Sequence, residues 1–188
     1  MLLIAFIQRF SNNSTEILLV LSVILMINVP LAAVDVNGCK DNTKCNKTSQ
    51  CSWEKLSSAV RSNHLDFIKN CLKQGAKVKN EAGGENPLLV TASIYNHLEI
   101  IKLLLDHGAD INAAGENNMT ALHFRVHIHL VDQATGASSE ELERSYSVIR
   151  FLLDSGADIY HRNTGGQTAI DLAEDNEQIL KLLKSYLD

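Results

Sequence analysis

The stretch that decides the fold is HLEIIKLLLDHGADIN, residues 97–112. Its apolar residues Ile101, Leu104 and Leu105 recur at helical spacing, which predicts a helix with one buried face. Gly108 follows directly, and glycine just past a helix end adopts positive φ at low cost and satisfies the last carbonyls. The stretch therefore predicts an amphipathic helix that ends before Gly108.

The same pattern occurs twice more along the chain. Apolar residues at the same spacing precede a Gly-Ala pair in each copy, at Ile68, Cys71, Leu72 and Gly75-Ala76, and at Ile149, Leu152, Leu153 and Gly156-Ala157. Upstream, Leu56, Leu89 and Leu122 are spaced 33 residues apart, and Gly75 and Gly108 repeat this interval. A fixed period near 33 indicates a stacked repeat array, in which no unit buries its apolar face alone.

A shorter helix is expected before each of these helices. Three residues after the anchors Leu56, Leu89 and Ile170 stands an alanine, at Ala59, Ala92 and Ala173, which lets two helices approach closely; the third anchor is followed by Arg125 instead, so packing there must differ. Asn63 and Asn96 follow at equal offsets, each before His-Leu. Asparagine tolerates the left-handed conformation of a tight helix–helix turn.

These blocks resemble the ankyrin family. The resemblance rests on residues 97–112, on Thr120-Ala121-Leu122-His123 and on Thr168-Ala169-Ile170-Asp171-Leu172-Ala173, and it covers about 53–188. It implies an all-α ankyrin-repeat solenoid of about four helix–turn–helix repeats, at about 53–80, 81–113, 114–161 and 162–188. The first repeat lacks its β-turn finger, and the last ends in its second helix, as terminal repeats do.

The third repeat carries a long insertion. Leu122 and Ile170 are 48 residues apart, 15 more than the period. Thr135 to Ser139 indicates a turn, and Ser138 or Ser139 can cap a following helix that begins with Glu140 and Glu141. We expect both helices to be about two turns longer than usual. The alternative is a solvated loop without a role.

The N-terminal region predicts export. Residues 17–34 carry no charge and end in Leu31-Ala32-Ala33, which is typical of a signal peptide over residues 1–33 with a small-residue cleavage site. An uncleaved membrane anchor is the alternative, since 18 residues can just span a bilayer. A lipoprotein at Cys39 is a third, because Asn37 and Asp35 fit that motif poorly. Residues 34–52 then form a polar, cysteine-containing segment.

The cysteines favour an oxidising compartment. All four, Cys39, Cys45, Cys51 and Cys71, follow the apolar run. An even count behind a signal sequence indicates disulfides, with three possible pairings. We expect at least one disulfide to join the 39–51 segment to itself or to Cys71, and so to cover the open end of the first repeat. Cys71 aligns with core leucines, so a buried free thiol is its alternative.

The remaining features exclude several classes. The net charge of −5, without a strong basic patch, disfavours a nucleic-acid partner. There is no Gly-rich phosphate loop and no Gly-x-Ser-x-Gly turn, so neither an enzyme nor a cofactor is expected. His123 and His127 are placed to share a metal on a helix. The resemblance instead implies that His123 hydrogen-bonds around its turn, so we expect no metal site.

The resemblance implies that an unidentified protein partner binds the concave face made by fingers and first helices. It selects, for this surface, Arg61, Ile94, Tyr95, Glu116, Asn117, Met119, His127, Thr164 and Gln167. Ile94 and Tyr95, with Met119, are the expected anchors; burial by the neighbouring long hairpin is the alternative. The chain is thus expected to be a monomeric, non-catalytic interaction module, secreted or periplasmic after cleavage. A membrane-anchored cytosolic adaptor and a metal-dependent protein using the third-repeat histidines are the other hypotheses.

Overall fold

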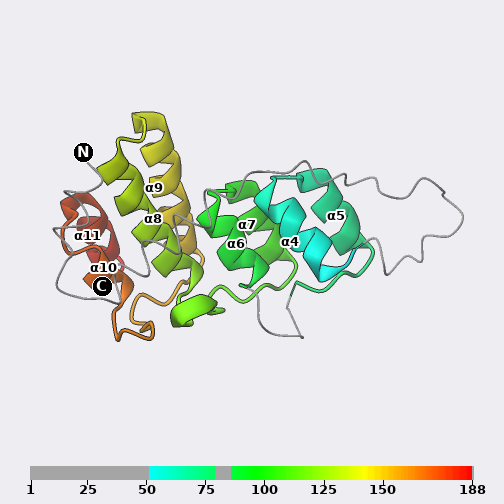
Figure 1. Cartoon of the computed structure of the whole chain (residues 1–188). Helices are drawn as coiled ribbons and strands as arrows, with labels where there is room; N and C mark the ends of the chain where they lie inside the picture. The colour runs from blue at the N-terminus through cyan, green and yellow to red at the C-terminus, as the bar shows by residue number, and fades with distance from the viewer. Residues whose placement is uncertain (1–50, 79–85, 188) are drawn as a thin grey trace, which may run out of the picture.

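The computed structural model describes residues 51–78 and 86–187, and every regular element in this part is helical. The α-helices form four antiparallel hairpins that stack side by side (Figure 1). Their bounds are α4 Trp53–Arg61 and α5 Leu65–Lys73, α6 Leu88–Ile94 and α7 Leu98–Asp106, α8 Ala121–Thr135 and α9 Ser139–Asp154, and α10 Ala169–Leu172 and α11 Glu177–Lys184. A 3₁₀ turn, η1 Glu116–Asn118, precedes α8.

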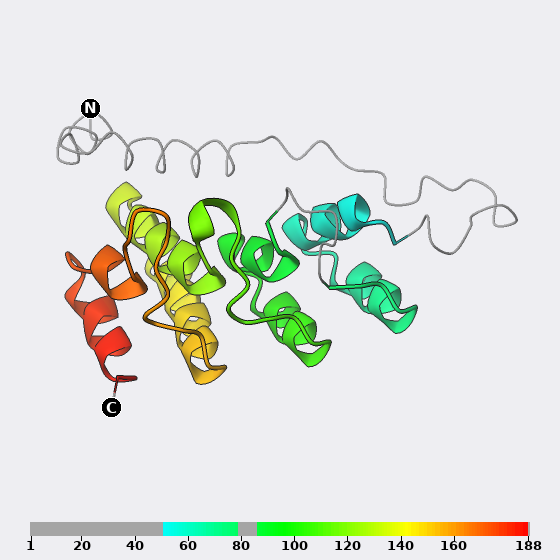
Figure 2. The same ribbon diagram turned by 90° about the horizontal axis from the view of Figure 1, so that it is seen from below.

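The first helices lie in one layer and the second helices in another, as Figure 2 shows. The core runs between the layers, and the anchors Leu56, Leu89 and Leu122 are each 1% exposed. The alanines expected at the close approach, Ala59 and Ala92, are likewise buried. Burial of repeated apolar faces against neighbours confirms the predicted all-α solenoid.

The predicted turn residues adopt the predicted backbone conformations. Asn63 and Asn96, which begin the helix–helix turns, have φ of 56° and 61°. Gly75, Gly108 and Gly156, which follow the second helices, have φ between 81° and 86°. These five positions explain why the hairpins recur with nearly constant geometry.

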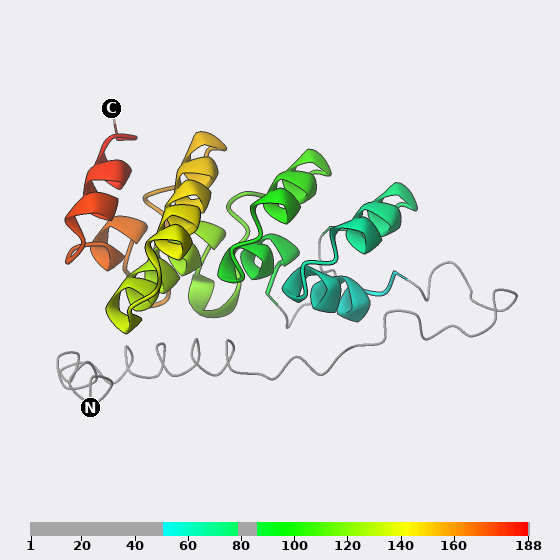
Figure 3. The same cartoon turned by 90° about the horizontal axis from the view of Figure 1, so that it is seen from above.

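The third hairpin is longer than its neighbours because both of its helices are extended. Helix α8 has 15 residues and α9 has 16, against 7 and 9 in the preceding hairpin. Gly136 ends α8 with φ 86°, and Ser138 and Glu141 cap α9 reciprocally, with the Glu141 amide donating to Ser138 Oγ over 3.3 Å. The expectation of two longer helices is confirmed, and a solvated loop is excluded. Figure 3 shows the hairpin projecting past α6 and α7.

The projecting hairpin is attached to the repeat that follows it. Asn176, the turn residue that caps α11, donates from its side-chain amide to Gln133 Oε1 near the end of α8, over 2.6 Å. Asn176 is itself buried. The extended part of α8 therefore contacts the turn of the fourth repeat.

A disulfide closes the first hairpin. Cys51, just before α4, is bonded to Cys71 in α5, with an S–S distance of 2.10 Å and Cα atoms 5.5 Å apart. This is one of the predicted pairings. Cys71 is completely buried, so it is both a core residue and a bonded cysteine. Cys39, Cys45 and the predicted signal peptide over residues 1–33 lie outside the described residues.

Membrane anchoring was tested for the described helices alone. None of the helices within residues 51–78 and 86–187 combines the length and the apolar composition that crossing a bilayer requires.

Candidate protein-binding surface

The two complete fingers form a connected, exposed strip. Glu116, Asn117 and Thr164 are exposed, and the Thr164 amide donates to the Asn117 carbonyl over 2.8 Å. The Asn118 side chain donates to the Arg162 carbonyl, also over 2.8 Å. These bonds fix one finger against the next, so their outer side chains are presented on a common scaffold.

The finger bases are held by hydrogen bonds around His123 and Asp171. His123 is fully buried; its Nδ1 lies 2.9 Å from Thr120 Oγ1 and its Nε2 3.3 Å from the Gln167 carbonyl. Burial lowers the pKa of His123. In the last repeat Asp171 occupies the aligned position and forms a capping box with Thr168. These contacts give both residues a structural role.

The third-repeat histidines do not converge on a common point. His129 Nδ1 is hydrogen-bonded to Ser145 Oγ at 2.9 Å, whereas both ring nitrogens of His123 are engaged as described above. Among the described residues, no three His, Cys, Asp or Glu side chains form a group that could hold a metal ion.

Two of the three expected anchors are not available for binding. Met119 is 1% exposed and Ile94 is 8% exposed, so the expectation that they form the binding surface is wrong. Met119 lies beneath the finger in the core, and Ile94, at the end of α6, packs towards the long α8 helix. Burial by the neighbouring hairpin, the alternative stated above, is what the structure shows.

The remaining predicted surface residues are accessible to different extents. Arg61 is exposed, and Tyr95 and Gln167 are half-buried. His127 faces surroundings that lower its pKa by desolvation, and its Nε2 is a buried atom without a hydrogen-bond partner. The accessible part of the predicted surface is therefore Arg61, Tyr95 and the finger strip.

Arg125 is the main feature that the sequence reasoning did not place. It is 1% exposed, and its Nη1 donates to the carbonyls of Ser93 and Ile94 over 3.2 and 3.3 Å. Its Nη2 is 3.0 Å from Asp132 Oδ2. Desolvation lowers the pKa of Arg125 to about 10, against the opposing effect of Asp132. Arg125 thus caps the C-terminal end of α6 and joins it to α8. The only signal was a long side chain where the other repeats have alanine.

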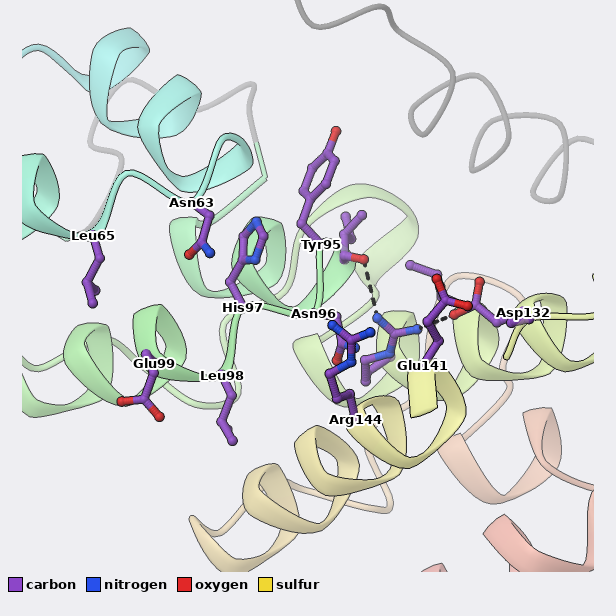
Figure 4. A pocket seen from close by; sticks show the side chains of 14 residues that line it. Asn63, Leu65, Tyr95, Asn96, His97, Leu98, Glu99, Asp132, Glu141 and Arg144 are labelled. Atoms are coloured by element: carbon purple, nitrogen blue, oxygen red, sulfur yellow. Dashed lines mark hydrogen bonds and ion pairs between the residues drawn. The ribbon is translucent and has the colours of Figure 1, made fainter. Parts of the chain in front are cut away.

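A groove of about 620 Å³ lies where the long hairpin rises beside the second repeat. The turn from Tyr95 to Leu98 forms one side, and Glu141 and Arg144 from the start of α9 form the other. Figure 4 shows Arg144 extending into this groove, with Asp132 and Glu141 towards the hairpin tip. The groove exists because α8 and α9 are longer than their neighbours.

Comparison with known proteins identifies the repeats. A family model described as ankyrin repeats (3 copies) matches residues 56–127. The chain is 26% identical over 132 residues, 70% of its length, to BRCA1-associated RING domain protein 1 of Caenorhabditis elegans, and 30% identical over 115 residues, 60% of its length, to human ankyrin repeat and SOCS box protein 6. It is also similar to alpha-latrocrustotoxin-Lt1a of Latrodectus tredecimguttatus, with 26% identity over 124 residues, 65% of its length.

The chain belongs to the ankyrin repeat family. Ankyrin repeats are generally protein–protein interaction modules without catalytic activity. The chain spans 16%, 25% and 8% of these three relatives, respectively, so their similarity concerns the repeats.

Proposed function

We propose that this chain is a non-catalytic protein-binding module that works outside the cytoplasm and holds its partner on the finger strip and the neighbouring first-helix ends. The observation that carries the binding role is the exposure of Glu116, Asn117 and Thr164 on fingers that are hydrogen-bonded together. A preorganised surface loses little conformational freedom on binding. Arg61 and Tyr95 extend this surface over the first two repeats.

The binding role is tested by reversing the character of the strip. Affinity capture from the native compartment supplies the partner, and its affinity is then measured for the wild type and for the double variant Glu116→Arg, Thr164→Arg. We expect at least a tenfold loss with an unchanged circular dichroism spectrum. Asp106→Arg, an exposed site at the end of α7, is the matched control and should bind normally. Unchanged affinity of the double variant would refute the surface assignment.

The export role is supported by the Cys51–Cys71 disulfide. Disulfides persist in secreted and periplasmic proteins and are rare in the cytosol. We expect N-terminal sequencing to find a mature chain that begins near Val34, with Cys51 and Cys71 oxidised. A full-length chain in the membrane fraction with both thiols free would instead support a membrane-anchored cytosolic adaptor.

A further inference from the structure

Buried polar atoms without partners gather where α6 ends against α8. Within the described residues these atoms are Ser93 Oγ, Asn96 Oδ1, Arg125 Nε and His127 Nε2. Asn96 and Arg125 also line the groove beside the long hairpin. Since buried polar groups in folded proteins are nearly always hydrogen-bonded, a concentration of such atoms at one groove indicates a place where a ligand supplies the partners.

The two atoms at the groove require complementary partners. Arg125 Nε is a donor and needs an acceptor, whereas Asn96 Oδ1 is an acceptor and needs a donor. A peptide group carries both, a carbonyl oxygen and an N–H. Around them the groove offers apolar side chains, among them Leu98 and Ile128, and the ring of Tyr95. This combination suits an extended main chain flanked by apolar side chains.

The charges around the groove are balanced. Arg125 is paired with Asp132, and Glu99 in the lining is paired with Lys102 at 2.8 Å. The remaining lining charges are Glu141 and Arg144, which have opposite signs. Because like and unlike charges nearly cancel, charge complementarity favours an uncharged segment over an acidic or a basic one.

We propose that this groove binds a short, extended, uncharged peptide segment of a partner protein, with one peptide group bridging Arg125 Nε and Asn96 Oδ1. The volume of about 620 Å³ is within the range of ligand pockets. The inference rests on the proposed function in that the partner is a protein, but it uses a surface separate from the fingers. It also gives the third-repeat insertion a role, because the extended helices form one wall of the site.

The experiment begins with a phage-displayed library of random heptapeptides, selected against the full, oxidised chain. We expect uncharged, apolar sequences to be enriched. The strongest peptide is then synthesised with both ends blocked, and its affinity is compared with that of the same peptide carrying N-methylated amides. Loss of the N–H donors should weaken binding about tenfold or more. Enrichment of charged sequences, or no enrichment, would overturn the proposal.

Two variants locate the peptide. Asn96→Gly removes Oδ1 while retaining the positive φ of 61°, and it should weaken the peptide about tenfold. Asn117→Gly is the matched control, because it makes the same change at φ 54° in an exposed finger, and it should bind as the wild type does. Equal binding by both variants would show that the peptide does not use Asn96 and that the groove is only hydrated.

A third variant distinguishes the charge of the occupant. Arg144→Gln should change peptide affinity less than twofold, whereas a tenfold loss would identify an acidic occupant and overturn the proposal. The finger variants separate this proposal from the proposed function. If no peptide binds the groove but Glu116→Arg, Thr164→Arg still releases the captured partner, the groove proposal fails alone.

Discussion

Replacing Arg125 with alanine should destabilise the protein, although alanine is the residue at this position in the other three repeats. The guanidinium makes charge-assisted bonds to the Ser93 and Ile94 carbonyls and to Asp132. Its removal leaves two carbonyls at the end of α6 and one carboxylate without their partner. Breaking one side of a buried ion pair costs about 3–5 kcal/mol. Because the Asp132 side chain is 34% exposed, water recovers part of this loss, and we expect about 3 kcal/mol.

Urea unfolding measures this difference. Circular dichroism follows the whole helix content, while the fluorescence of Trp53, the single tryptophan, follows the first repeat. Arg125→Met is the informative companion, because its apolar side chain fills much of the space and buried ion pairs can be replaced by hydrophobic residues at little cost. It should lose less than Arg125→Ala.

A double-mutant cycle with Asp132→Asn isolates the ion pair. The two changes should be non-additive, because each removes the same contact. The reasoning is refuted if Arg125→Ala is as stable as the wild type or more stable. That result would mean that close packing of small residues, the usual arrangement, outweighs the bonds described here.

Three further predictions concern stability. Cys51→Ser should lower the free energy of unfolding by roughly 3 kcal/mol for a link with a sequence separation of 20, and Trp53 fluorescence should respond at lower urea than in the wild type; coincident curves would argue against the disulfide. Burial lowers the pKa values of His123, His127 and His129 from 6.5, so the unfolded chain binds more protons below that pH. Thermal stability should therefore be greatest above pH 6.5 and fall as the pH decreases through and below it, whereas a rise on acidification would contradict this. Ser138→Ala should cost about 1 kcal/mol by removing the cap of α9, while Ser139→Ala, the adjacent control, should change stability by a few tenths only.

Most of the fold was predictable because its signals are local. The left-handed turns depend on Asn63 and Asn96, the helix ends on Gly75 and Gly108, and the long hairpin on a break at Gly136 followed by Ser138. Each of these residues has a conformational preference that acts within a few positions. The repetition then multiplied a weak local signal into a specific one.

The binding surface was less predictable because exposure depends on neighbours. Ile94 and Met119 occupy register positions that face outward in a regular array, but here they are buried. The cause is the enlarged third hairpin, whose packing no residue near Ile94 announces. Arg125 was recognisable as an exception to the alanine pattern, yet its partners, the Ser93 and Ile94 carbonyls, are 31 and 32 residues away.

The long hairpin also has a consequence for how the array unfolds. Solenoids behave as one-dimensional chains in which each unit is coupled to its nearest neighbours alone, so that ends fray first. Here α8 holds the second repeat through Arg125 and the fourth through the Gln133–Asn176 bond, which strengthens both interfaces of the third repeat at once. We expect the last three repeats to melt as one cooperative block, and the first repeat, with its own covalent closure, to form a separate thermodynamic unit at the boundary.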